Sequence, residues 1–420
     1  MTEFKEIKYK INYRDIKSSF ILKRIFSFLN EKKILDMMKY SNELQKAFLV
    51  NIKDYKRISG KYKIVEKNGR GREYLINSNI LIFEGEYLNG RKNGKGKEYF
   101  YNGRLKFEGK YLNGKKWNGI GLHINGFKEF EIIDGKGNIK EYDSNSGVLI
   151  FEGEYLNGER NGKGKEYDVN GKLKFEGEYL NGERNGNGKE HCEFGDLIFE
   201  GRYLNGRKNG KGREYHYNFN IKFEGEYING ERYGKGIEYY KNGNIKFKDE
   251  YLSGKIWNGN GYNIKGNIEF EIKDGNGKIK EYYDDGKLIF EGDYLKGERN
   301  KKGKEYDILY GKLKFEGEYL NGKRNGKGKE YFYNGNLKFE GEYLKGKNWN
   351  GNGYHINGKK EFEIKNGKGN IKEYNFYEGN LEFEGEYLNG ERNGKGRSYD
   401  SYSGILIFEG QYLNGKRINK

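Results

Sequence analysis

Residues 151–164 read Phe-Glu-Gly-Glu-Tyr-Leu-Asn-Gly-Glu-Arg-Asn-Gly-Lys-Gly, and close copies of this stretch recur along most of the chain. Its opening phenylalanine recurs twelve times between Phe83 and Phe408, mostly at spacings of 24 or 25 residues. Three intervals are longer, at 43 or 44 residues, and each holds a shortened copy that begins Phe-Glu-Ile at residue 130, 270 or 362. A degenerate copy precedes them at 59–74. A fixed period of this kind is typical of proteins built from stacked supersecondary units.

Each copy has the pattern of a β-hairpin. Leu105, Phe107, Gly109 and Tyr111 alternate with charged residues, which is the period of a strand with one apolar face. The glycine between the two aromatic residues leaves a gap on that face, and an aromatic ring from a neighbouring strand can cover it. Asn-Gly pairs such as residues 89–90 follow, and this dipeptide is the strongest short signal for a hairpin turn.

The repeat predicts a mostly β protein: an elongated, single-layer antiparallel meander of about 15 stacked hairpins, in which every strand pairs with its sequence neighbour. Strands about 4.8 Å apart would make this sheet roughly 150 Å long. The chain contains no proline, which fits this prediction because proline cannot donate the amide hydrogen bond that a central strand needs. A single hairpin is not stable alone, so stacking has to supply the buried surface.

Composition excludes several classes of protein. Glycine occurs 66 times and tyrosine 39 times in 420 residues, while the single cysteine, Cys192, rules out a disulfide framework and fits a reducing, cytoplasmic compartment. No apolar run is long enough to span a membrane, and the N-terminus does not resemble a secretion signal. The net charge is +17, but the repeats interleave Lys and Glu, so we expect no specific nucleic-acid binding. The basic N-terminal segment favours weak attraction to anionic phospholipids.

The stretch at 151–164, together with the linking Asn-Gly-Lys-Leu-Lys-Phe at 170–175, resembles the MORN repeat in its variant form. The resemblance covers roughly residues 59–420. It implies an elongated, twisted β-solenoid and a scaffold that binds proteins, self-associates, or places a protein at a membrane, sometimes by binding phospholipid. The sequence thus favours a non-catalytic scaffold, peripheral to membranes in one alternative. The open last unit would allow an end-to-end homodimer.

Residues 1–57 form a separate predicted domain, ahead of the repeat array at 58–420. Between residues 18 and 57 the hydrophobic period changes from two to 3.6, which predicts three short helices, with Asn30 and Asn42 as caps. One interpretation is a helical cap over the first strand. The other is an F-box-like module, because residues 22–35 resemble the F-box core, although its usual prolines and tryptophan are missing. That resemblance implies a substrate receptor that docks on the adaptor subunit of a cullin-based ubiquitin ligase through residues 18–57. The implied contacts are Leu22, Ile25, Phe26, Leu29, Ile34 and Leu35.

Candidate chemistry is sparse. The four histidines lack metal-ligand spacing, and the Gly-Lys-Gly stretches fail the phosphate-loop pattern, so we expect no catalytic, cofactor or metal site. Asp249 and Lys301 replace glycines of the repeat. Trp117, Trp257 and Trp349 each stand in Trp-Asn-Gly-x-Gly, one in each long interval, with one extra residue that suggests a bulge. They would either anchor a partner or fill space beside the shortened copy.

Overall fold

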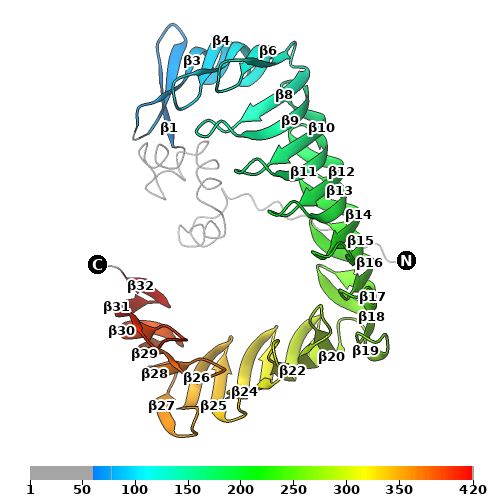
Figure 1. Ribbon diagram of the computed structural model, residues 1–420, viewed down its shortest axis with the longest axis vertical. Helices are drawn as coiled ribbons and strands as arrows, with labels where there is room; N and C mark the ends of the chain where they lie inside the picture. Colours follow the sequence, from blue (N-terminus) through cyan, green and yellow to red (C-terminus); the bar gives the residue numbers. More distant parts are fainter. Residues whose placement is uncertain (1–59, 77, 419–420) are drawn as a thin grey trace, which may run out of the picture. The chain divides into compact units, whose positions relative to one another are not determined.

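The computed structural model describes residues 60–418 except residue 77 (Figure 1). The predicted helical domain, its F-box-like contacts and its boundary at residue 57 lie outside these residues. The described part of the chain consists of strands and turns, and no helix occurs in it.

The strands form four antiparallel sheets in chain order. The first sheet holds β1 (Lys61–Val65), β2 (Arg70–Leu75), β3 (Leu81–Leu88), β4 (Arg91–Tyr99), β5 (Leu105–Leu112), β6 (Lys115–Leu122) and β7 (Lys128–Ile132). The second sheet holds β8 (Gly137–Tyr142), β9 (Leu149–Leu156), β10 (Glu159–Tyr167), β11 (Leu173–Leu180), β12 (Glu183–His191), β13 (Leu197–Leu204), β14 (Arg207–Tyr215), β15 (Ile221–Ile228), β16 (Glu231–Tyr239), β17 (Ile245–Leu252), β18 (Lys255–Tyr262) and β19 (Ile268–Ile272).

The third sheet holds β20 (Gly277–Tyr282), β21 (Leu288–Leu295), β22 (Glu298–Tyr306), β23 (Leu313–Leu320), β24 (Lys323–Tyr331), β25 (Leu337–Leu344), β26 (Lys347–Tyr354) and β27 (Lys360–Ile364). The fourth sheet holds β28 (Gly369–Tyr374), β29 (Leu381–Leu388), β30 (Glu391–Tyr399), β31 (Leu406–Leu413) and β32 (Lys416–Ile418). Within each sheet, hydrogen-bonded neighbours follow one another in sequence, which confirms the predicted antiparallel meander.

The turns are those that the sequence predicts. β3 and β4 are joined by two residues, Asn89 and Gly90, whose φ angles are 50° and 75°. Positive φ at both central positions is the type I′ geometry that matches the twist of a hairpin, and Asn and Gly tolerate it best. The wider connection between β4 and β5 is closed by the amide of Phe100, which donates to the carbonyl of Arg104 at 2.8 Å. The degenerate copy at 59–74 also forms a hairpin, β1–β2.

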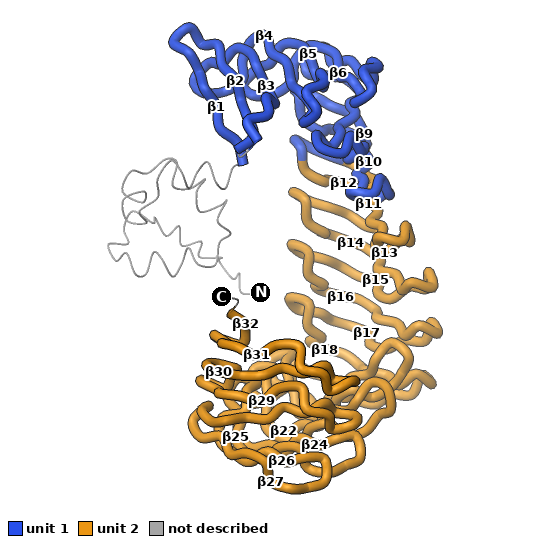
Figure 2. Tube along the Cα trace, turned by 60° about the vertical axis from the view of Figure 1, so that its left-hand side comes forward, with its two compact units in different colours: residues 1–173, 179–182 blue, residues 174–178, 183–420 orange. Residues whose placement is uncertain are grey.

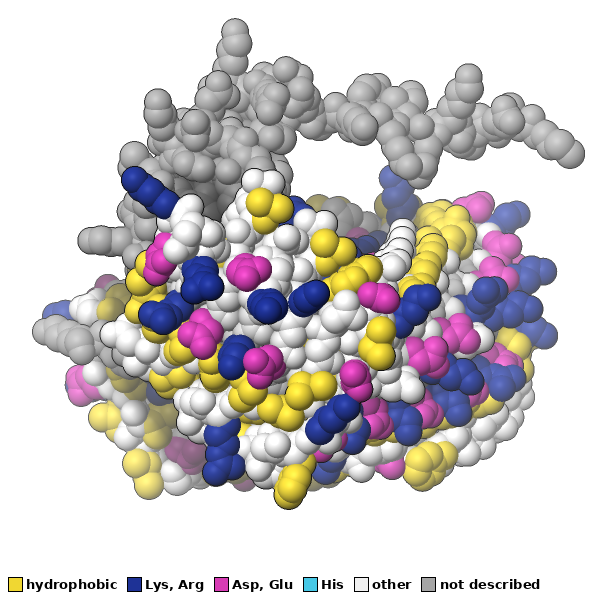
Figure 3. All heavy atoms as spheres, turned by 90° about the horizontal axis from the view of Figure 1, so that it is seen from above, with side chains coloured by type: hydrophobic (Ala, Val, Ile, Leu, Met, Phe, Trp, Pro, Cys, Tyr) yellow, Lys and Arg dark blue, Asp and Glu magenta, His cyan; other side chains and the backbone are white. Residues whose placement is uncertain are grey.

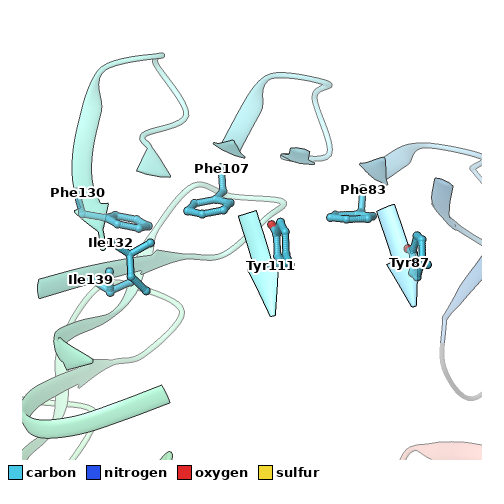
Figure 4. Close-up of a cluster of buried hydrophobic side chains, with 7 residues drawn as sticks. All are labelled: Phe83, Tyr87, Phe107, Tyr111, Phe130, Ile132 and Ile139. Atoms are coloured by element: carbon cyan, nitrogen blue, oxygen red, sulfur yellow. The ribbon is translucent and has the colours of Figure 1, made fainter. Parts of the chain in front are cut away.

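Aromatic side chains of alternate strands build the core on one face of each sheet. Phe83 and Phe107 are fully buried, and Tyr111 is edge-on to both, with ring centroids 5.3 and 5.5 Å away (Figure 4). Edge-to-face pairs at this separation stabilise a core beyond their area of contact. The same Phe–Tyr pairing repeats along the chain, as at Phe223 and Tyr251, 5.1 Å apart. The predicted apolar face is therefore continuous from hairpin to hairpin within a sheet.

Three short hairpins, β7–β8, β19–β20 and β27–β28, separate the four sheets. The two strands of each pair only through one isolated bridge beside the turn, such as Ile133 to Lys136. Ordinary hairpins pair a glycine with a glycine at their centre, but Ile132 and Ile139 occupy these positions in β7 and β8. Both isoleucines are buried, at 1% and 2% exposure, in one cluster with Phe107 and Phe130 (Figure 4). They leave no room for the Phe130 ring over its own hairpin, and this ring lies over Gly121 of β6 instead. The prediction that every strand pairs fully with its neighbour is wrong at these three places.

The chain divides into two compact units (Figure 2). Unit 1 comprises residues 1–173 with 179–182, and its described strands are β1–β10 with part of β11. Unit 2 comprises residues 174–178 with 183–420 and holds β12–β32 with the remainder of β11. The first short hairpin lies in unit 1, and the second and third lie in unit 2.

Candidate interaction surface

Glycines form a row across the centre of each sheet. In the third sheet Gly292, Gly303, Gly317, Gly328, Gly341 and Gly351 stand opposite one another on successive strands. A Cβ atom on Gly317 would lie 2.6 Å from the Cα of Gly328 and 2.7 Å from Cζ of Phe315. Only glycine therefore lets the phenylalanine ring lie across two strands. An aromatic ring covers Gly317, but it belongs to Phe315 of the same strand and not, as predicted, to a neighbouring strand. The same ring also lies over Gly328 of the paired strand β24.

The opposite face of the sheet carries a groove whose floor is the glycine backbone. In unit 2 a groove of about 1120 Å³ runs over β19–β26, and in unit 1 one of about 960 Å³ runs over β1–β6. Charged residues on either side of each glycine form the walls. In the third sheet the residues that line the groove include Lys280, Glu291, Asp293, Lys302, Lys304, Glu316, Glu318, Lys327, Lys329, Glu340 and Glu342.

Charges of opposite sign alternate along each wall. Pairing places Lys280, Glu291, Lys304, Glu316, Lys329 and Glu340 in one row, one residue on each successive strand. In unit 1, Lys97 Nζ lies 3.2 Å from Glu108 Oε1, and both side chains are nearly half exposed. Figure 3 shows basic and acidic side chains interspersed on the face turned to the viewer. Exposed pairs of this kind contribute little to stability, so the wall charges are available to a partner.

Two groups fix the wall carboxylates in place. Tyr331 donates its hydroxyl to Glu316 at 2.6 Å, and burial together with this hydrogen bond raises the pKa of Tyr331 to about 12. Glu318 accepts the backbone amide of Lys327 at 2.9 Å, at the β-bulge where the pairing of β23 with β24 shifts register. These contacts repeat in other hairpins, so the groove walls have the same geometry at each step.

The core face carries a half-buried ladder of ion pairs. Arg232 Cζ lies 4.0 Å from the ring centroid of Phe223, and its guanidinium bridges Glu214 at 2.5 Å and Glu238 at 3.2 Å. Tyr227 also donates to Glu214, at 2.8 Å. Burial raises the pKa of Glu214, but Arg232 and Tyr227 outweigh this effect and hold it below its ordinary value. The arginine thus joins two hairpins while its flat face covers the phenylalanine.

The three predicted tryptophans lie beside the short hairpins. Each is half-buried, and Cζ3 of Trp117 would be 2.8 Å from a Cβ on Gly135, in the turn of the first short hairpin. The Gly135 amide donates to the carbonyl of Trp117 at 2.8 Å, and the Gly158 amide donates to Gly135 at 2.9 Å. Trp257 and Trp349 make the same contacts with Gly275 and Gly367. The three tryptophans therefore pack against the turns of the short hairpins and remain partly exposed.

Sequence reasoning treated the wall charges as an ordinary surface and so missed the groove. A signal was present: each charged residue keeps a fixed offset of one from a row glycine, as Glu316 and Glu318 do around Gly317. The candidate contacts in residues 22–35 lie outside the described part. Within residues 60–418 without 77, no three His, Cys, Asp or Glu side chains gather as a metal site would require. The same part contains no helix long and apolar enough to cross a membrane.

Comparison with known proteins identifies the repeat. The model of the MORN repeat matches residues 83–103, 151–172, 175–195, 199–220, 223–245, 315–337 and 383–401. No curated protein matches the chain significantly in sequence. Among solved structures, TcdB2-TccC3 without its hypervariable C-terminal region is 12% identical over 82% of this chain, with a TM-score of 0.17. TarM from S. aureus is 10% identical over 46%, with a TM-score of 0.13. The chain spans 18% and 30% of the lengths of these two proteins.

Proposed function

The chain is a MORN-repeat protein, and from this premise we propose that it is a non-catalytic scaffold whose groove holds an extended segment of a partner protein. The observation that carries the proposal is the alternating row of wall charges over the glycine floor, repeated without interruption from Lys280 to Glu340. A repeated surface of this kind is suited to a long ligand that touches several hairpins in turn.

The charge pattern favours a polypeptide over a nucleic acid. Lys304 and Lys329 each stand between two glutamates, and the row holds three lysines and three glutamates, so a phosphate backbone would meet as many like charges as opposite ones. A polypeptide can present acidic and basic side chains in the same alternation. Each contact is shallow and solvent-exposed, so affinity should come from the number of hairpins engaged and should fall as hairpins are removed.

The test is affinity purification from the cells that make the protein, with a groove variant and a matched control as baits. Lys304→Glu with Lys329→Glu reverses two exposed wall charges of the third sheet. Lys296→Glu with Lys345→Glu makes the same change in net charge at two exposed turn residues outside the groove. Proteins that the wild type and the turn variant capture, and that the groove variant loses, support the proposal. Equal capture by all three baits would refute it.

Four further predictions from the sequence do not involve the groove, and each has its own test. Residues 18–57 remain predicted either as an edge cap or as an F-box-type receptor. Capture of the ubiquitin-ligase adaptor by the wild type, lost in Ile25→Asp, would support the receptor; no capture would leave the edge cap. Flotation with anionic vesicles tests the alternative of a peripheral phospholipid-binding anchor. Sedimentation equilibrium tests the end-to-end homodimer, and imaging of the tagged chain tests the cytoplasmic location.

A further inference from the structure

Four turns in the described chain share one hydrogen-bonding scheme: residues 143–148, 307–312, 375–380 and 400–405. The first residue of each donates its amide to the carbonyl of the sixth, as Asp307 does to Lys312 at 2.8 Å. Its side-chain oxygen accepts the amide of the fourth residue, as in Asp307 with Tyr310, also at 2.8 Å. The scheme needs only the first side chain and the glycine at the fifth position, so it leaves the middle residues free to vary.

The middle residues differ sharply between these turns. Residues 144–146 are Ser-Asn-Ser, and Ser146 adds a bond from Oγ to Asp143 at 2.8 Å. Residues 308–310 are Ile-Leu-Tyr, and they are 43%, 58% and 62% exposed. Because polar residues close the same turn at 143–148, the fold does not require the apolar ones. Exposed apolar residues that the fold does not need point to an interaction.

Aromatic rings from three turns of unit 2 gather at this place. We call Tyr310, Tyr333, Phe376 and Tyr377 the aromatic patch. The ring centroid of Tyr310 lies 5.0 Å from that of Tyr333 and 6.2 Å from that of Tyr377, and Tyr333 lies 6.3 Å from Phe376. The Tyr333 amide donates to the Phe376 carbonyl at 2.8 Å, and Tyr377 donates its hydroxyl to Asp307 at 2.7 Å. These two bonds hold the turns side by side, so the patch is built before any ligand arrives.

Hydrogen-bonding and charged groups surround the rings. The hydroxyls of Tyr310 and Tyr333 make no hydrogen bond to any residue that the structure describes. Lys312 Nζ lies 5.9 Å from the ring centroid of Tyr333, and Lys314 Nζ lies 5.7 Å from that of Phe376. None of these residues lines the groove, so the patch is a second surface.

We propose that the aromatic patch binds a proline-rich segment of a partner protein in the polyproline II conformation. Proline rings pack against aromatic faces, and the segment is already stiff, so little conformational entropy is lost on binding. A polyproline II helix has no internal hydrogen bonds, and its carbonyls can accept from the Tyr310 and Tyr333 hydroxyls. Lys312 and Lys314 favour an acidic residue beside the prolines. The 420 residues contain no proline, so they cannot supply this segment themselves.

A bilayer is the competing occupant, because Ile308 and Leu309 are exposed at the tip of the turn. The patch favours a polypeptide for two reasons. Its rings contact one another edge to face and make one continuous surface, and its free hydroxyls would lose hydrogen bonds to water in an apolar layer but gain bonds to peptide carbonyls.

The test titrates the full chain with a synthetic decaproline peptide in a calorimeter. Tyr310→Ser installs the residue that Ser146 and Ser403 supply in the equivalent turns, where Oγ bonds the first aspartate, so the variant should fold. We expect it to weaken binding about tenfold or more, as for loss of a central aromatic anchor. Tyr217→Ser removes a tyrosine that is 71% exposed but lies in another turn, and it should bind as the wild type does.

A second variant and a binding measurement with phospholipid vesicles complete the test. Tyr333→Lys installs the residue found at the second short hairpin, where the Lys241 amide makes the equivalent bond to Asp284 at 3.0 Å. It should weaken peptide binding as well, which keeps the proposal testable if Tyr310→Ser unfolds. Failure of the wild type to bind decaproline, or unchanged binding by both variants, overturns the proposal. Cosedimentation with phosphatidylcholine–phosphatidylserine vesicles that depends on Tyr310, without peptide binding, would assign the patch to a membrane and overturn it too.

Discussion

Replacement of Gly317 by alanine tests whether the glycine row is required by packing. The new Cβ would lie 2.6 Å from the Cα of Gly328, 2.7 Å from the carbonyl oxygen of Lys327 and 2.7 Å from Cζ of Phe315. Two of these three atoms belong to the backbone of the paired strand β24, so they can move only if the pair separates. The φ angle of Gly317 is not in the left-handed region, so the cost is steric.

The expected loss in the free energy of unfolding is about 3 kcal/mol or more, at the upper end for overpacking, because the neighbours cannot relax. Gly322→Ala is the matched control in the same hairpin. A Cβ there would meet nothing within 4 Å, and the substitution costs only the left-handed φ of 77°, about 1 kcal/mol. The comparison separates steric overlap from backbone strain within one repeat.

Urea unfolding followed by tryptophan fluorescence measures both costs by linear extrapolation, and hydrogen exchange of the β23 and β24 amides locates them. Gly317→Ala should speed exchange in these two strands far more than Gly322→Ala does. Equal free-energy losses, within about 0.5 kcal/mol, would refute the argument that the row exists so that phenylalanine can cover two strands.

Three further predictions follow from single residues. Burial raises the pKa of Glu98, but Lys116 and Lys92 outweigh it and lower the value to about 2, below the value of about 4.3 expected when unfolded. The stabilisation from Glu98 should thus be complete above pH 4.3 and fade as the pH falls towards 2, and Glu98→Gln should flatten this part of the curve of thermal midpoint against pH. Asp249→Gly should stabilise unit 2 by about 1–3 kcal/mol in urea, because Asp249 holds a φ of 136° that glycine adopts without strain; a destabilised variant would show that the carboxylate has a structural role. Trp349→Ala should destabilise the third short hairpin by about 2–4 kcal/mol, since the indole covers Gly367, and fast exchange confined to β26–β28 is the expected signature; unchanged protection there would leave the ring without a packing role.

The ordinary hairpins could be predicted from the sequence because their determinants are local. Alternation in residues such as Phe107 and Tyr111 fixes the buried face, and Asn89-Gly90 fixes the turn, within a span of a few residues. Every strand pair inside a sheet then follows from chain order alone. The predicted helical domain at 1–57 and its F-box-like residues lie outside the described chain and stay predictions.

How far each candidate surface could be predicted depended on how far apart its residues lie in the sequence. The groove joins residues one hairpin apart, so its rows could have been read from the fixed offset of Lys and Glu around the row glycines. The aromatic patch could not, because Tyr310 and Tyr377 are 67 positions apart and meet only where the short hairpin β27–β28 draws their turns together. The sequence pattern within one repeat does not indicate a contact between residues of different repeats.

The repeating hairpin, its turns, its aromatic face and its likeness to the MORN repeat could be predicted because each rests on residues that are neighbours in the chain. The shortened copies were visible in the sequence, but only the structure showed that strand pairing breaks there and which turns meet. In an ordinary hairpin the phenylalanine ring lies over a glycine pair of its own two strands, as Phe83 does over Gly85 and Gly96. Ile132 and Ile139 replace such a pair and are buried, so the Phe130 ring lies over Gly121 of the preceding strand instead. The sheet ends at each short hairpin, and turns that are distant in the chain come into contact beside it.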